Sequence, residues 1–179
     1  MENIFSTRER IRILETVIYK RDNISVNNIA NQLKLSKGLV SKYFDILVKE
    51  GIAKKSNGKF VINNSSVTKG IRILLNINHI STKIFEKYPF IKSVGLYGSC
   101  AKGENNEDSD VDLWIMIGET SEEKQAALTS ELNKAIKNLR ILFLTDKKIE
   151  KLKKEDTLFY HSLAFGSIII YGDKGGIQL

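Results

Sequence analysis

The chain has 179 residues, of which 42% are hydrophobic and 27% are charged, and its net charge at neutral pH is +7. This composition is typical of globular proteins and leaves room for one small and one medium domain. No apolar run approaches the roughly 20 residues of a membrane span, and the N-terminal MENIFSTRERIR lacks the apolar stretch of a signal peptide. The single cysteine, Cys100, excludes an internal disulfide, so we expect a cytoplasmic location.

The excess positive charge lies almost entirely in the first third of the chain. Residues 1–66 carry twelve Lys and Arg against six Asp and Glu, whereas residues 67–179 have a net charge of only +1. This asymmetry favours a polyanion as the partner of the first segment, with a solvated basic surface as the alternative.

Apolar spacing predicts three helices in this basic third. Ser6 or Thr7, Ser25 and Ser36 can cap them at their N-termini. The apolar positions are Ile11, Leu14 and Ile18, then Ile29, Ala30 and Leu33, and then Leu39, Val40, Tyr43, Phe44 and Leu47.

Two short β-prone runs follow the third helix and bracket Asn57-Gly58, the strongest short signal for a hairpin. Three helices and a basic hairpin, over ISVNNIANQLKLSKGLVSKYFDILVKEGIAKKSNGKFVIN, resemble the winged helix-turn-helix domains of prokaryotic transcription regulators. The resemblance implies double-stranded DNA as a partner, with the third helix in the major groove. The candidate DNA-binding residues are Ser36, Lys37, Ser41 and Lys42 on that helix and Lys54, Lys55 and Lys59 on the hairpin.

The third helix, which would be the recognition helix, is rich in lysine and poor in arginine, and this favours contact with phosphates over readout of bases. A winged helix used for protein contact or dimerisation is the alternative. We place the domain boundary at the polar break of residues 63–66, so that residues 1–66 and 67–179 form two domains. Apolar spacing then predicts a helix from residue 67 to Lys87, which ends before Pro89.

An acidic loop between two apolar runs is the strongest chemical signal: GLYGSCAKGENNEDSDVDLWIMI, residues 95–117. The first run ends at Gly98-Ser99, where a tight turn followed by a helix start can hold phosphate oxygens. Asp110 and Asp112 flank Val111 at the start of the second run, so both carboxylates point to one face of a strand. Two carboxylates beside a phosphate cradle favour a divalent ion, Mg²⁺ or Mn²⁺, together with substrate phosphates.

Two other motifs fit this loop poorly. In an EF-hand loop that began at Asp108, the position that needs Gly is Leu113, and the strand-like WIMI follows. A Walker P-loop needs a second Gly followed by Lys and Ser or Thr, which the residues after Gly98 lack.

The spacing G-S-x10-D-x-D, with GLYGS before it and SDVDLWI at its end, resembles the signature of minimal nucleotidyltransferases of the polymerase-β type. The resemblance implies a mixed sheet with flanking helices over residues 67–179, and hence an α/β (α+β) protein overall. It implies that Gly98 and Ser99 contact the triphosphate of an NTP and that Asp110 and Asp112 bind the metal ions. Lys102 is a further candidate for a phosphate contact.

Members of this family normally carry a third carboxylate on a later strand, and here the strand NLRILFLT has Arg140 at that position. A guanidinium neither ligates Mg²⁺ nor accepts a proton at neutral pH. The site therefore either binds nucleotide without fast transfer, or Arg140 pairs with the acidic residues. Asp146, just past the strand, is an alternative source of the third acid, although it follows about 20 Å further along the strand.

The sequence thus predicts a domain that binds Mg-NTP and transfers a nucleoside monophosphate to a hydroxyl of a protein or other docked acceptor, after a DNA-binding winged helix. A non-catalytic transcription regulator, whose second domain is a ligand sensor or dimerisation unit, is one alternative. An antitoxin that modifies a HEPN-type toxin is another. The resemblance to regulators also allows a homodimer, although the sequence shows no dimer seam, and we expect no membrane partner.

Overall fold

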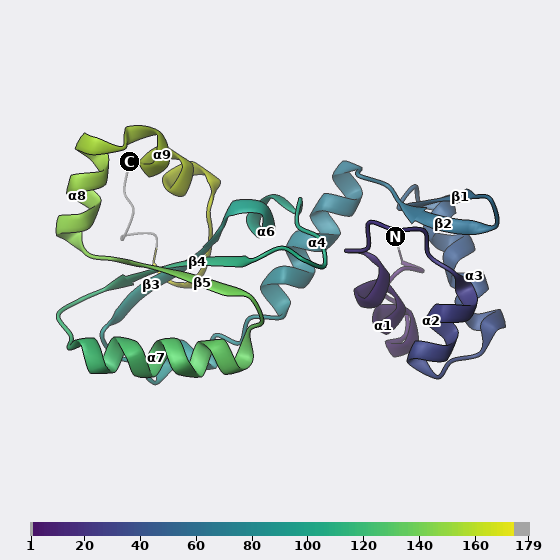
Figure 1. Cartoon of the computed structure of the whole chain (residues 1–179), viewed down its shortest axis with the longest axis horizontal. Coiled ribbons are helices and arrows are strands. Elements are labelled where there is room, and N and C mark those ends of the chain that lie inside the picture. The colour runs from purple at the N-terminus through teal and green to yellow at the C-terminus, as the bar shows by residue number, and fades with distance from the viewer. Residues whose placement is uncertain (1, 174–179) are drawn as a thin grey trace. The chain divides into compact units, whose positions relative to one another are not determined.

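The computed structural model describes residues 2–173, which form two compact units (Figure 1). One unit runs to Leu75 and includes Asn105–Asp108, and the other holds Asn76–Glu104 and the described chain from Ser109 onward. The division therefore falls within helix α4 (Ser66–Asn78). Among residues 2–173, no helix is both long enough and apolar enough to cross a membrane.

The N-terminal unit has three helices and then a hairpin, in the order that the sequence predicts. Their bounds are α1 Arg8–Val17, α2 Val26–Leu33, α3 Lys37–Lys49, β1 Ala53–Ser56 and β2 Lys59–Ile62. Thr7 and Ser36 cap α1 and α3, since each side chain accepts a backbone N–H of the first turn. Asn57 and Gly58 have φ angles of 49° and 73°, as a two-residue hairpin turn with two left-handed residues requires.

The apolar faces of these elements meet in one core. Phe44 of α3 stacks on Phe60 of β2, with 4.4 Å between the ring centroids. Ile71 and Leu75 of α4 are buried in the same core, so the compact unit extends past Ser66. The functional division after Ser66 stays a prediction.

The C-terminal unit is built on a mixed four-stranded sheet in the order β5-β4-β3-β6. Its elements are α5 Lys83–Glu86, β3 Ile91–Tyr97, α6 Gly98–Lys102, β4 Val111–Ile117, α7 Glu122–Ala135, β5 Leu139–Leu144, α8 Asp146–Glu155, α9 Thr157–Gly166 and β6 Ile168–Gly172. Strand β3 is antiparallel to β4 and β6, whereas β4 and β5 are parallel and connected through α7. The mixed α+β class is the one that the sequence predicts.

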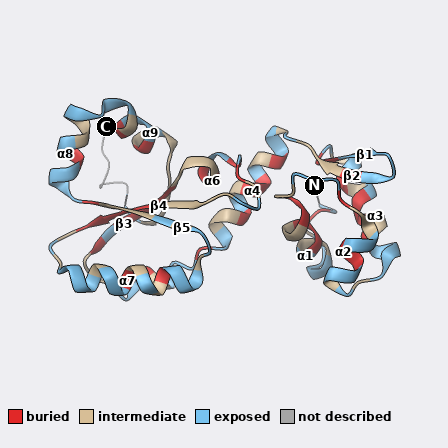
Figure 2. Ribbon diagram, viewed as in Figure 1, coloured by how far each residue is buried: buried red, intermediate tan, exposed pale blue. Residues whose placement is uncertain are grey.

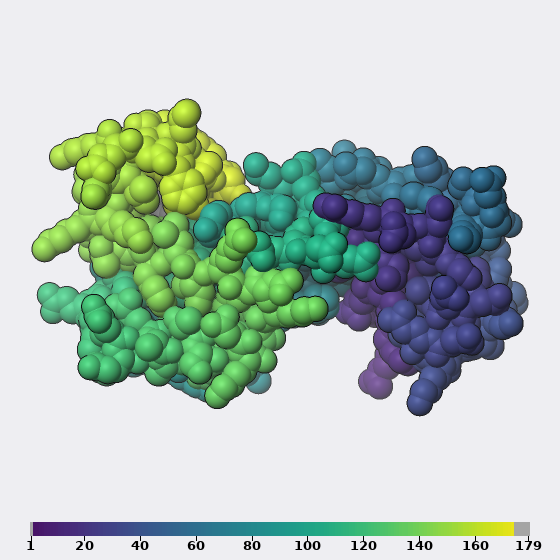
Figure 3. Space-filling view, in the orientation of Figure 1, coloured from purple at the N-terminus to yellow at the C-terminus, as the bar shows by residue number. Residues whose placement is uncertain are grey.

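Helices cover both faces of this sheet, α7 on one face and α8 and α9 on the other (Figure 1). Leu128 of α7 packs with Leu113 of β4 on the first face, and Leu163 of α9 packs with Trp114 on the second. Buried residues accordingly concentrate in the sheet, between the exposed outer faces of α7 and α8 (Figure 2). The side chains of α8 and α9, yellow-green in the space-filling view, form the outer surface over the second face (Figure 3).

The single helix predicted from residue 67 to Lys87 is wrong, because α4 ends at Asn78 and a separate short helix, α5, spans Lys83–Glu86. The residues between them include His79, Ser81 and Thr82, which have low helix propensity. Ile80 lies in this break and is only 6% exposed in the core of the C-terminal unit. Burial of Ile80 thus accompanies the break.

Candidate functional site

The turn after β3 lies directly against the acidic start of β4. Tyr97, the last residue of β3, is the register partner of Asp112. Gly98 follows with a φ of 70°, and a Cβ added to it would lie 2.7 Å from Asp112 Oδ2. Only glycine fits both the left-handed backbone and this close approach. The Gly-Ser turn and the second aspartate, which the sequence separates by 13 positions, are therefore neighbours in space.

The two aspartates lie on the face of the sheet that α8 and α9 cover. Asp112 alternates with Leu113 and so shares a face with Trp114 and Met116, which pack in the core under these helices. Burial raises the pKa of the Asp112 carboxyl above its ordinary value, the Arg140 guanidinium lowers it, and the Asp110 carboxylate raises it again. This carboxylate is thus held where its negative charge is poorly solvated, and a bound cation would stabilise it.

Arg140 completes the acidic site from β5. It is the register partner of Asp112 in the parallel β4–β5 pair, and its Nη2 lies 2.7 Å from Asp110 Oδ2. The side chains of Arg140 and Asp110 are 70% and 36% exposed. The predicted pairing of Arg140 with the acidic residues is therefore confirmed.

The alternative that Asp146 supplies a third carboxylate is wrong. Arg140 lies at the start of β5, whereas Asp146 follows the end of this strand and begins α8. The Asp146 carboxylate accepts a hydrogen bond from Lys92 Nζ at 3.1 Å. Within residues 2–173, no group of three or more His, Cys, Asp or Glu side chains is placed to hold a metal ion. The carboxylates at this site are those of Asp110 and Asp112.

The other residues of the turn have distinct environments. Cys100 is 1% exposed and its thiol donates to the Asp110 carbonyl at 3.4 Å. Burial raises the pKa of this thiol to about 11, so it stays protonated and is a poor nucleophile. Ser99 is half-buried beside it at the start of α6, and Lys102 is exposed at the end of α6.

Sequence reasoning missed two aromatic residues at this site. Burial and then the Asp112 carboxylate raise the pKa of Tyr97, and its ring meets that of Phe159 from α9 edge to face, 6.5 Å between centroids. The position of Tyr97 directly before Gly98 is a weak signal that it lines the site. No local pattern points to Phe159, which reaches the site only because α9 folds over this face.

The candidate DNA-binding residues all lie in the N-terminal unit. The side chains of Lys37, Lys42 and the three hairpin lysines are exposed, and Ser41 is half-buried. Ser36 is exposed and its hydroxyl accepts the Leu39 N–H at 3.2 Å as the cap of α3. On the hairpin, Lys55 Nζ lies 5.9 Å from the centroid of the Phe60 ring. The aliphatic stem of this lysine therefore lies along the apolar surface of the ring.

The sequence profile described as "Polymerase beta, Nucleotidyltransferase" matches residues 80–174, slightly more than half of the chain. The chain belongs to this nucleotidyltransferase family. The match covers the Gly98-Ser99 turn, both aspartates and Arg140, whereas the candidate DNA-binding residues lie outside it. No curated protein matches the chain.

Several solved structures are weakly similar. A crystal structure described as a toxin-antitoxin with AMP-PNP is 17% identical, with 56% of this chain and 76% of that chain covered and a TM-score of 0.41. A Sulfolobus solfataricus protein described as a nucleotidyltransferase is 18% identical, with 65% and 96% covered and a TM-score of 0.39. A tri-AMPylated HEPN toxin of Shewanella oneidensis in complex with MNT antitoxin is 12% identical, with 60% and 75% covered and a TM-score of 0.34. The family assignment rests on the profile match.

Proposed function

We propose that the C-terminal unit binds a nucleoside triphosphate with a divalent metal ion and transfers the nucleoside monophosphate to an acceptor hydroxyl. The observation that carries this proposal is the close approach of Gly98 to Asp112. It places a turn that has no side chain next to a half-buried carboxylate. The family match supports the same chemistry.

The residues present fit a metal–triphosphate ligand in part. Asp112 has a raised pKa because it is buried, so a cation at this carboxylate would offset its poor solvation. Asp110 would be the second ligand, although its Oδ2 is already paired with Arg140. Mg²⁺ or Mn²⁺ bound there would neutralise negative charge on the phosphate oxygens.

Each neighbouring residue has a proposed part in binding. Gly98 lets the triphosphate approach the backbone closely, because no Cβ blocks it, and Ser99 offers a hydroxyl beside it. Lys102 is exposed at the end of the same short helix and would pair with an outer phosphate. In the transfer, the acceptor oxygen forms a bond to the α-phosphorus while the bond to pyrophosphate breaks. We propose a protein as the acceptor.

Binding is tested by calorimetric titration with each of the four NTPs, with and without Mg²⁺. Binding that requires Mg²⁺ and disappears in Asp110→Ala/Asp112→Ala supports the proposal. Asp146→Asn is the matched control, because it removes a carboxylate of the same unit that lies outside the site. Equal binding by the wild type and the double variant would refute it.

A second candidate function is favoured by the Arg140–Asp110 ion pair, which leaves the acidic site with one carboxylate already neutralised. On this basis the unit would bind nucleotide as a sensor without transferring it. For a sensor, an NTP labelled at its α-phosphorus should bind but leave no label on any protein offered as acceptor. Label that appears on an acceptor and is lost in Asp112→Asn identifies a transferase.

We further propose that residues 1–66 are a winged helix that binds double-stranded DNA through Lys37 and Lys42 on α3. Three helices followed by a hairpin, with exposed lysines on both α3 and the hairpin, support this assignment. Log K falls linearly with log salt, and each phosphate contact adds about 0.9 to the magnitude of this negative slope. Lys37→Ala/Lys42→Ala should therefore weaken DNA binding and reduce the magnitude of this slope by about two.

Fluorescence anisotropy with labelled duplexes at several salt concentrations measures this slope. Lys124→Ala/Lys134→Ala on α7 is the matched control, with the same loss of charge in the other unit. A slope that the α3 variant leaves unchanged would exclude this mode of docking. Winged-helix folds used only for protein contact would show no DNA binding in any form of the chain.

A further inference from the structure

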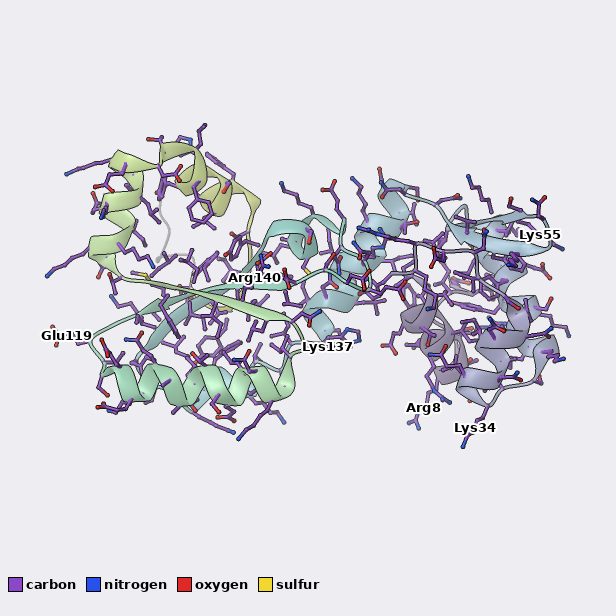
Figure 4. The ribbon with its side chains drawn as sticks, in the orientation of Figure 1. Arg8, Lys34, Lys55, Glu119, Lys137 and Arg140 are labelled. Carbon is purple, nitrogen blue, oxygen red and sulfur yellow. The ribbon has the colours of Figure 1, made fainter. Side chains whose placement is uncertain are left out.

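The acidic site contains its own cation. Asp110 precedes β4, Asp112 lies within it, and Arg140 stands in register beside Asp112 on β5. The Arg140 guanidinium lies 2.7 Å from Asp110 Oδ2. Ion pairs between side chains as exposed as these are weak, so each partner can exchange the other for a competing charge. Figure 4 shows Arg140 in the middle of the C-terminal unit and Lys137 just before the same strand.

A guanidinium and a divalent ion compete for the same carboxylate. Arginine is always charged and has no lone pair for a metal, so it adds repulsion without adding a ligand. A metal ion that approached Asp110 would compete with Arg140 for Oδ2 and would be repelled by the positive charge of the guanidinium. Arg140 is also 70% exposed, so its side chain can turn into solvent without leaving a buried gap.

We propose that Arg140 is a built-in competitor of the divalent ion at Asp110, so that the site takes up its metal together with the triphosphate of the nucleotide. The triphosphate brings negative charge that pairs with Arg140 in place of Asp110, and Asp110 is then released to ligate the metal. This inference rests on the proposed function, since it concerns the same site.

The competition makes nucleotide and metal binding mutually supportive. Free metal ions bind the nucleotide-free protein weakly, because one carboxylate is occupied. Coupling between two ligands is reciprocal, so the nucleotide strengthens metal binding by the same factor as the metal strengthens nucleotide binding. The chain would therefore respond to metal–nucleotide complexes and stay largely indifferent to free divalent ions.

The test uses Mn²⁺ alone as the probe, with the full chain, and free Mn²⁺ is measured by electron paramagnetic resonance at low ionic strength. A unit charge roughly 5 Å from a divalent ion in a water-like dielectric weakens binding about tenfold. Arg140→Gln is thus expected to bind Mn²⁺ about tenfold more tightly than the wild type, and Arg140→Asp more tightly still. The gain should shrink at high salt, because the site is exposed and charges there are screened.

Two controls separate a local effect from a general change of charge. Lys137→Gln removes a positive charge three residues from Arg140, from an exposed side chain in the segment before β5, and is expected to leave Mn²⁺ affinity within about twofold of the wild type. Arg140→Lys keeps the charge and should remain close to the wild type. Circular dichroism confirms that each variant is folded, which the exposure of Arg140 favours.

The outcomes distinguish this inference from the proposed function. Mn²⁺ bound with equal affinity by the wild type, Arg140→Gln and Lys137→Gln overturns the competition and leaves the proposed function standing if Mg-NTP still binds. Tighter Mn²⁺ binding in Arg140→Gln and Arg140→Asp, but not in Lys137→Gln, supports the competition whether or not transfer is ever observed. Absence of Mn²⁺ binding in every form, Arg140→Asp included, overturns the competition, and the proposed function is then judged separately by the Mg²⁺-dependent NTP titration.

Discussion

Gly98 is the residue at which conformation and site geometry can be tested together. Alanine at this position would hold a φ of 70°, and its Cβ would lie 2.7 Å from Asp112 Oδ2. The left-handed backbone costs an L-residue about 1–2 kcal/mol. Crowding of the carboxylate adds about 1–3 kcal/mol, as for other overpacked sites. We therefore expect Gly98→Ala to destabilise the C-terminal unit by about 2–5 kcal/mol.

Urea unfolding followed by tryptophan fluorescence measures this loss. Trp114 is the only tryptophan and is 1% exposed in β4, so its signal reports on the C-terminal unit alone. With a slope of about 2 kcal/mol per molar urea, the midpoint should fall by about 1–2.5 M. Gly166→Ala is the matched control, because its Cβ would have no atom within 4 Å and its φ is not positive.

A double-mutant cycle divides the two contributions. In an Asp112→Ala background the carboxylate is absent, so Gly98→Ala should cost only the backbone term of about 1–2 kcal/mol. An unchanged midpoint for Gly98→Ala in the wild-type background would refute the reasoning. An identical cost in both backgrounds would show that the contact with Asp112 contributes nothing.

Two further predictions concern other groups. The Tyr43 hydroxyl is buried and donates to the Ile4 carbonyl at 3.0 Å, so Tyr43→Phe should destabilise the N-terminal unit by about 1–2 kcal/mol, measured by the urea dependence of its circular dichroism. Burial raises the pKa of Asp112, so the native state binds more protons than the unfolded state between the ordinary and the raised pKa. The free energy of unfolding therefore falls as pH rises through that window. Asp112→Asn should be more stable than the wild type at neutral pH in metal-free buffer, and the difference should disappear in acid. Equal stability of both proteins at all pH values would contradict the second prediction, and a Tyr43→Phe midpoint equal to the wild type would contradict the first.

Local sequence patterns determined much of the secondary structure. Asn57-Gly58 predicts the hairpin because these residues tolerate positive φ, and both adopt it. Alternation along β5 predicts opposite faces, and Ile141 and Leu142 indeed pack in different cores. Glycine at position 98 and the Asp-x-Asp spacing predict the site's chemistry, since residue type and strand period are properties of a few adjacent residues.

The tertiary structure alone decided how separate segments meet. The ion pair of Arg140 with Asp110 depends on the parallel register of β4 and β5, which is set only after α7 has crossed between them. Phe159 reaches Tyr97 because α9 packs over that face, and Asp146 is held away by Lys92. The break before α5 also depends on burial of Ile80 in a core that no local pattern specifies. Propensity and periodicity act over one or two turns, whereas register and burial are settled by the packing of the whole unit.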